Sequence, residues 1–245
     1  MNENTDDNFQ NLINWKNLMK KSHDFKTQKP FNFAFVEDFF TKEFYDKLYD
    51  TYPKIDESWE FHEGPSKSQY GRYWNKQTTS YNQPGDDPSL SESWNLLKRY
   101  SQSDEFISNF REFSGVPVKK MKYIMFMSYR QGGFQFPHIH NVGPSTIVLM
   151  FYFSKNWEHG DPGGTYMAET PDEDSIIFEP YNLDNSLALF LDGPKAAHGV
   201  RYIPKNVVRQ GFQIILEGYS DETGWTGTKE EEDTSKDRKI RYANV

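Results

Sequence analysis

Short runs of bulky residues, separated by Gly, Pro, Asn and Asp, dominate the second half of this chain of 245 residues. Evenly spaced runs of this kind predict β-strands that form a sandwich or a barrel. Barrels of this length are commonly undivided, so we expect one mainly β (α+β) domain. The predicted strands cover residues 123–129, 146–153, 175–178, 186–191 and 211–217.

The first half of the chain predicts elements that support this sheet. Residues 31–36 alternate as a strand should. Thr41 is a candidate N-cap for a helix that Pro53 ends. Residues 58–88 are aromatic, polar and rich in Gly and Pro, which indicates hairpins and loops.

A longer helical stretch is predicted for residues 91–113, with a break near 103–104 and an end at Gly115. Large apolar residues recur along it at helical spacing, and we interpret them as core packing rather than as a cofactor site. These residues are Trp94, Leu97, Phe106, Phe110 and Phe113.

Composition divides the chain into three segments. Residues 1–30 form a polar lead with one helical patch, 31–225 hold the predicted domain, and 226–245 form a charged tail. The acidic run from Glu230 to Asp233 is followed by basic residues, a pattern typical of solvated tails.

The charge pattern excludes several classes of partner. The net charge is -8 and the estimated pI is about 5.3, so we expect no nucleic-acid partner, which would require a basic surface. The polar N-terminus does not resemble a signal peptide, and no apolar run has membrane-spanning length. We therefore expect a soluble cytoplasmic protein that does not bind membranes.

Three of the six histidines form a spaced pattern. His138 and His140 are two residues apart, so both side chains point to one face of an extended segment. His198 follows the predicted strand at 186–191 and can complete a facial site of three nitrogen ligands if the strands pair. The chain contains no Cys, which leaves His, Asp and Glu as ligands and favours Fe(II), Mn or Zn.

Arg209 comes just before the predicted strand at 211–217. Its planar guanidinium can bind a carboxylate with two hydrogen bonds. Three protein ligands on one face of a metal would leave positions for a chelating co-substrate and O2. Arg201 is the competing anchor, and Tyr129 is either a co-substrate hydrogen-bond donor or a buried barrel tyrosine.

Several segments together carry a family resemblance: 129–132 before Pro137-His138, 146–153 with Asn156-Trp157, Gly163-Gly164, 185–190, and 198–200 with Arg209. On these elements, residues 31–219 resemble the Fe(II)/2-oxoglutarate-dependent oxygenases, in particular those related to prolyl hydroxylases. The resemblance implies a double-stranded β-helix (jelly roll), iron at His138 and His198, and Arg209 on the distal carboxylate of 2-oxoglutarate. It also implies a hydroxylase that uses O2 and forms succinate.

One position departs from the family pattern. Members usually carry an acidic residue two positions after the first histidine, where this chain has His140. Three neutral imidazoles would leave the full charge of the divalent ion on the site. Three outcomes are open: a site of His138, His140 and His198, a two-histidine site with His140 turned away, or an inactive relic. A carboxylate could also come from elsewhere, the candidates being Asp161, Glu169 and Asp192.

Other functions remain open on the sequence. A cupin-like three-histidine dioxygenase without an oxoacid is one alternative, although the glutamate expected soon after His140 is absent. A non-catalytic binding protein of oxygenase fold is another. The substrate, a small molecule or a peptidyl group, stays unidentified, and so do the oligomeric state and the choice of hydroxylation over halogenation or desaturation. Residues 72–75 are candidates for the substrate pocket, whereas His23, His62 and His159 are interpreted as ordinary core or surface residues.

Overall fold

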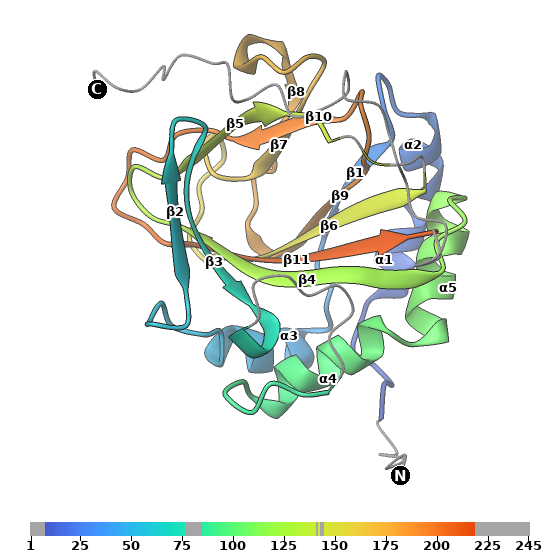
Figure 1. Cartoon of the computed structure of the whole chain (residues 1–245). Helices are drawn as coiled ribbons and strands as arrows, with labels where there is room; N and C mark the ends of the chain where they lie inside the picture. Colours follow the sequence, from blue (N-terminus) through green and yellow to red (C-terminus); the bar gives the residue numbers. More distant parts are fainter. Residues whose placement is uncertain (1–7, 77–84, 141, 143–144, 219–245) are drawn as a thin grey trace.

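The computed structural model describes residues 8–76, 85–140, 142 and 145–218. Within them, one sheet of eleven strands curls so that β5, β10, β7 and β8 lie opposite β4, β11 and β6 (Figure 1). The strand order is β1-β9-β6-β11-β4-β3-β5-β10-β7-β8, with β2 paired to β3. Every pairing is antiparallel. This arrangement confirms the predicted double-stranded β-helix.

The strands and helices have the following bounds. The strands are β1 (Phe33–Glu37), β2 (Glu60–Gly64), β3 (Lys67–Tyr73), β4 (Lys120–Tyr129), β5 (Phe134–His138), β6 (Thr146–Phe153), β7 (Thr165–Ala168), β8 (Ile176–Phe178), β9 (Asp184–Leu191), β10 (Ala197–Val200) and β11 (Arg209–Glu217). The helices are α1 (Trp15–Met19), α2 (Ser22–Thr27), α3 (Lys42–Asp50), α4 (Glu92–Ser101) and α5 (Asp104–Ser114), with 3-10 turns at Trp74–Lys76 and Glu173–Ser175.

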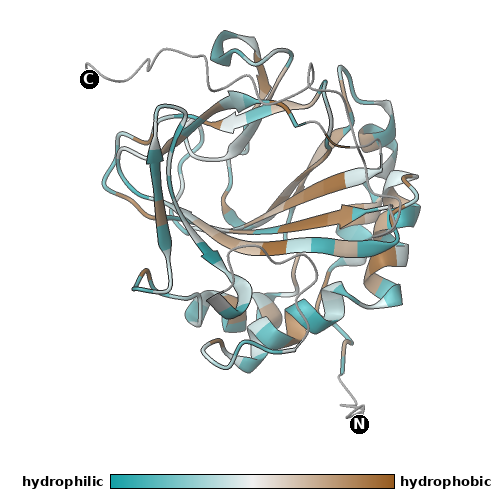
Figure 2. Cartoon of the chain, viewed as in Figure 1, coloured by the Kyte–Doolittle hydropathy of each residue, from teal (hydrophilic) through white to brown (hydrophobic). Residues whose placement is uncertain are grey.

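The central strands are buried on both faces. All eight residues of β6 are buried, and alternate residues belong to different clusters, as the two-residue period of a strand requires. Leu149 and Phe151 pack on the helical side, whereas Val148 and Met150 face the interior of the curled sheet. Figure 2 shows this apolar centre as brown strands, with more hydrophilic residues on the outer surfaces of the helices.

Helices α4 and α5 close the helical side of the sheet. Ser91 and Ser103 cap their first turns by accepting hydrogen bonds from the backbone N–H groups of Trp94 and Phe106. Gly115 ends α5 in the left-handed conformation, with a φ of 71°. Trp94 is fully buried, with its ring 4.7 Å from that of Phe126 in β4. The predicted pair of helices and its buried stripe are therefore confirmed.

Three short strands, β5, β7 and β10, are not among the strands predicted from the sequence. β5, β7 and β10 have four or five residues each, and Pro137 and Gly199 interrupt the apolar patterns of β5 and β10. Such short segments acquire their structure from pairing with neighbours rather than from their own composition.

Helices α1 and α2, near the N-terminus, belong to the core of the domain. Leu18 in α1 and Phe25 in α2 are fully buried and join the core on the helical side. Residues 226–245, predicted as a charged tail, lie outside the described residues. Within the described part of the chain, no helix is long and apolar enough to cross a membrane.

Candidate metal centre and anion site

The three patterned histidines come together where β5 and β10 meet. His198 in β10 lies directly opposite His138 in β5, and their ring centroids are 4.3 Å apart. His140, two residues after β5 ends, lies 4.8 Å from His138 and 4.9 Å from His198 by the same measure. One nitrogen from each ring lies within 4.8 Å of the others, so the cluster can hold a metal ion. His140 is therefore not turned away.

The backbone fixes the orientation of the two buried rings. Nδ1 of His138 lies 2.9 Å from the carbonyl oxygen of Phe136, and Nδ1 of His198 lies 2.7 Å from that of Ala196. A carbonyl oxygen only accepts hydrogen bonds, so Nδ1 carries the proton in both rings. The lone pair of each ring therefore lies on Nε2, the tautomer that a metal ligand requires.

The third ring has a carboxylate behind it. Nδ1 of His140 lies 2.8 Å from Oδ2 of Asp192, a residue just after β9 that is only 4% exposed. Oδ1 of Asp192 accepts a hydrogen bond of 2.9 Å from the backbone N–H of Gly193. Of the other candidate carboxylates, Asp161 pairs with Lys205 away from the cluster.

His198 is buried, with 6% of its surface exposed. Burial lowers the pKa of its imidazole well below the ordinary value, and the neighbouring His138 and His140 lower it further. The ring of Phe190 packs 4.5 Å away. His198 is consequently neutral at pH 7, as metal coordination through nitrogen requires.

Arg209 is a fully buried cation at the start of β11. Its Nε donates to the carbonyl oxygen of Gly163 at 3.1 Å, and Nη2 donates to Oγ1 of Thr165 at 3.2 Å. The guanidinium lies over the rings of Tyr129 and Tyr152, 4.9 Å from each centroid. Its Nη1 has no hydrogen-bond partner, and within the described residues no carboxylate forms an ion pair with it. A buried, unpaired cation is costly, so this group is a candidate site for an anionic ligand.

Gly211 makes room for this guanidinium. Residues 209 and 211 point to the same face of β11, and a Cβ added to Gly211 would lie 2.8 Å from Nη1 of Arg209. The competing arginine, Arg201, lies elsewhere and pairs with Glu179 at 2.6 Å. Of the two candidate anchors, Arg209 is therefore the buried one.

A cavity of about 230 Å³ is lined by the three histidines and by two residues that contact Arg209. Its lining includes His138, His140 and His198 at one end and Tyr129 and Thr165, which contact Arg209, at the other. Much of the remaining wall is apolar and contains Met125, Met127, Val148, Met150 and Phe190.

Polar contacts follow the wall between the two ends. The hydroxyl of Tyr129 donates to Oε1 of Gln69 at 2.6 Å and approaches Oε1 of Gln135 at 3.2 Å. The side-chain nitrogen of Gln135 lies 3.3 Å from Nε2 of His138. Tyr129 is therefore buried, lines the cavity and has protein partners for its hydroxyl.

The structure corrects several expectations. Of residues 72–75, only Tyr73 lines the cavity. Arg72 is buried in an ion pair of 2.9 Å with Asp87, and Trp74 is fully buried in the core. His62, interpreted as an ordinary residue, lines the cavity.

The contributions of Gln69, Gln135 and Thr165 were not anticipated. These residues carry no local signal, because only strand pairing brings them to the cavity. Asp192 was a candidate carboxylate, but its position behind His140 was not predicted.

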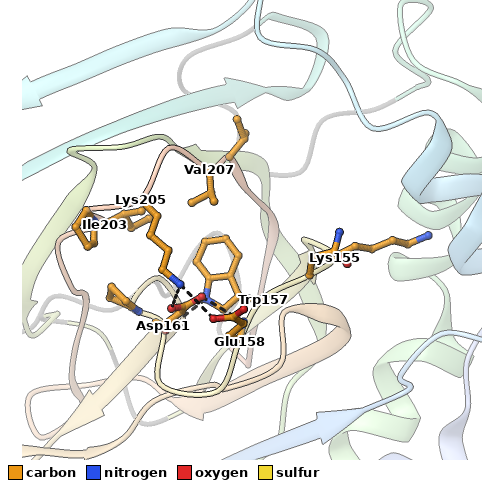
Figure 3. Close-up of a pocket in the computed structure, with 11 residues that line it drawn as sticks. Lys155, Trp157, Glu158, Asp161, Ile203, Lys205 and Val207 are labelled. Atoms are coloured by element: carbon orange, nitrogen blue, oxygen red, sulfur yellow. Dashed lines mark hydrogen bonds and ion pairs between the residues drawn. The ribbon is translucent and has the colours of Figure 1, made fainter.

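A second pocket of about 300 Å³ is lined by Trp157, Asp161 and Lys205, among others (Figure 3). Trp157 in this pocket packs against Gly163, where an added Cβ would lie 2.5 Å from the indole ring. Lys205 points toward Asp161 and Glu158, at 2.6 and 3.4 Å. This cation is therefore already paired with two carboxylates.

Comparisons with known proteins agree with the fold. No protein-family model matches the sequence, and no curated protein matches it significantly. The structure is similar to a Pseudomonas putida prolyl-4-hydroxylase (TM-score 0.57, 14% identity, covering 82% of this chain and 99% of that one). It is also similar to a Trichoplax adhaerens prolyl hydroxylase in complex with a hypoxia inducible factor peptide fragment (0.57, 14%, 83% and 89%).

A third similar structure is HygX from Streptomyces hygroscopicus with nickel, 2-oxoglutarate and hygromycin B bound. Its TM-score is 0.50, with 11% identity over 81% of this chain and 86% of that one. Identities this low establish architecture and no more. This chain has the fold of the 2-oxoglutarate- and Fe(II)-dependent oxygenases, with a cluster of three histidines at the junction of β5 and β10.

Proposed function

We propose that the protein is an Fe(II)- and 2-oxoglutarate-dependent oxygenase that hydroxylates an unactivated C–H bond. The observation that carries this proposal is the buried guanidinium of Arg209. Its Nη1 is unpaired, and it contacts Tyr129 and Thr165, which line the same cavity as the three histidines. With iron and 2-oxoglutarate bound, one oxygen atom of O2 would enter succinate as the oxoacid loses CO2. The other oxygen atom of O2 would enter the substrate.

Each end of the cavity has a separate role in this proposal. The Nε2 atoms of His138, His140 and His198 hold the metal on one face, which leaves positions for the oxoacid and O2. Arg209 binds the distal carboxylate through Nη1, while its other nitrogens remain bonded to Gly163 and Thr165. Orienting the oxoacid before reaction in this way is a main source of catalytic advantage.

The apolar wall serves the same chemistry. Met125, Met127, Val148, Met150 and Phe190 limit the water near the metal. The substrate is a small molecule or a peptidyl group, the two kinds of ligand bound in the Streptomyces and Trichoplax structures.

A second candidate is a three-histidine metalloprotein that uses no oxoacid, as in cupins. The absence of an acidic residue from the cluster favours it. It gives no purpose to the unpaired Nη1 of Arg209.

Succinate formation tests the proposal. Metal-free protein is loaded with Fe(II) without oxygen, and 2-oxoglutarate, O2 and pools of small molecules or prolyl peptides are then added. We expect wild-type protein to form succinate and both Arg209→Met and His198→Ala to form almost none. Arg111→Met, which alters an exposed arginine of α5, is the control and should match wild type. Metal binding without succinate in wild type would support the cupin-like alternative.

A further inference from the structure

The metal cluster contains no acidic ligand, yet a buried carboxylate lies one imidazole ring away. Asp192 contacts Nδ1 of His140 at 2.8 Å, on the side of the ring away from Nε2. We propose that Asp192 is a positioning residue that takes the place of the missing acidic ligand by acting through His140. This inference rests on the metal-binding part of the proposed function and not on its oxoacid part.

The position of Asp192 is closely determined by the fold. It follows β9, where Leu191 pairs with Ile147 of β6, and its backbone N–H donates to the carbonyl oxygen of Thr146 at 2.9 Å. Its Oδ1 accepts from Gly193 and its Oδ2 faces His140. Its side chain is 2% exposed, and it faces the Nδ1 of His140. A carboxylate buried this deeply requires a partner of positive or partly positive charge.

Asp192 determines which nitrogen of His140 is available. A carboxylate accepts the hydrogen bond that Nδ1–H donates, so the lone pair of His140 lies on Nε2. The backbone carbonyls of Phe136 and Ala196 fix the same tautomer in His138 and His198. The side chain of His140 is 37% exposed, and the contact that holds its Nδ1 is with the buried carboxylate of Asp192.

Asp192 also restores the charge balance. Three neutral imidazoles leave the full charge of a divalent ion on the site, whereas a site of two histidines and one carboxylate removes one unit. With Asp192 counted, the three-histidine cluster and its immediate surroundings carry that same single negative charge. A carboxylate that accepts a hydrogen bond from a metal-bound histidine also raises the basicity of that ligand.

Metal affinity measured without oxoacid or O2 tests this inference. Co(II) is titrated into metal-free protein and followed by calorimetry and visible absorption. We expect Asp192→Asn to weaken Co(II) binding about 10- to 100-fold, the usual effect of losing such a partner. The absorption spectrum of bound Co(II) should also change, because the His140 ring is no longer held. Asp161→Asn, which alters a carboxylate paired with Lys205, should leave the affinity within about twofold of wild type.

A double-mutant cycle separates positioning from general damage to the fold. In the His140→Asp background the metal receives a carboxylate directly, so adding Asp192→Asn should cause no further loss of affinity. Equal losses in both backgrounds, or a wild-type affinity for Asp192→Asn, would overturn the inference while leaving the proposed function intact. Failure of wild-type protein to bind Co(II) would overturn the metal site and this inference together.

Discussion

The surroundings of Arg209 and of the three histidines differ in where their charged groups lie. At one end Arg209 is a buried cation surrounded by neutral groups, namely Gly163, Thr165 and the rings of Tyr129 and Tyr152. At the other end three histidines supply only neutral nitrogen ligands, and the acidic group lies behind one of them.

The difference shows how each charge relates to its ligand. Arg209 retains one unpaired donor, so an anion can bind it directly. Asp192 is already engaged by His140 and Gly193, so its charge reaches a cation only through the His140 ring. In the proposed function, an anion would therefore contact Arg209 directly, whereas the charge of Asp192 would act on the metal through His140.

Removing a histidine should disable the metal end most completely. We expect His198→Ala to weaken Co(II) binding by about 100-fold or more, since a ligand contributes more than the partner of a ligand. The titration described for Asp192 measures this directly. His159→Ala, at an exposed position outside the cluster, is the matched control and should bind like wild type. Normal binding by His198→Ala would place the metal elsewhere.

Replacing Arg209 should weaken oxoacid binding without weakening metal binding. We expect Arg209→Met to weaken 2-oxoglutarate binding about 10- to 100-fold, since charge-assisted hydrogen bonds contribute about 1.5–3 kcal/mol. Co(II) affinity should stay within about twofold of wild type, because Arg209 contacts none of the histidines in the described bonds. Calorimetry with each ligand provides both values. A parallel loss of Co(II) affinity would show that Arg209 also supports the metal site itself.

Crowding the guanidinium should produce a smaller effect of the same kind. A Cβ at Gly211 would lie 2.8 Å from Nη1 of Arg209, so Gly211→Ala should displace that nitrogen and weaken 2-oxoglutarate binding about tenfold. Gly64→Ala is the control, since an added Cβ there meets nothing within 4 Å. Unchanged oxoacid affinity in Gly211→Ala would argue against Nη1 as the donor.

The hydroxyl of Tyr129 should contribute least. It already donates to Gln69, so Tyr129→Phe should retain the ring that contacts Arg209 and weaken 2-oxoglutarate binding only about two- to threefold. The same calorimetric titration distinguishes the alternatives. A loss of tenfold or more would mean that the hydroxyl leaves Gln69 and bonds the oxoacid itself.

Much of the architecture could be predicted because its signals are local. The run at 146–153 forms β6 with those bounds, and the second capped helix, α5, ends at Gly115 as the pattern indicates. The spacing of His138 and His140 also indicated a shared direction. Their proximity to His198 was predictable only on the condition that distant strands pair, which β5 and β10 do.

The rest depends on contacts between residues far apart in the chain. Asp192 reaches His140 across 52 residues, and Tyr129 reaches Gln69 across 60, so no local pattern marks either pair. Arg209 and Arg201 had similar local settings, and only burial and the ion pair of Arg201 with Glu179 distinguish them.

Coupling between metal and oxoacid tests the central claim most directly. The affinity for 2-oxoglutarate is measured by calorimetry, without oxygen, in metal-free and Co(II)-loaded protein. If the three histidines and Arg209 form one composite site, Co(II) should tighten 2-oxoglutarate binding at least about tenfold, and 2-oxoglutarate should tighten Co(II) binding by the same factor. Equal oxoacid affinity with and without metal would contradict the account, because the two ends would then be separate sites.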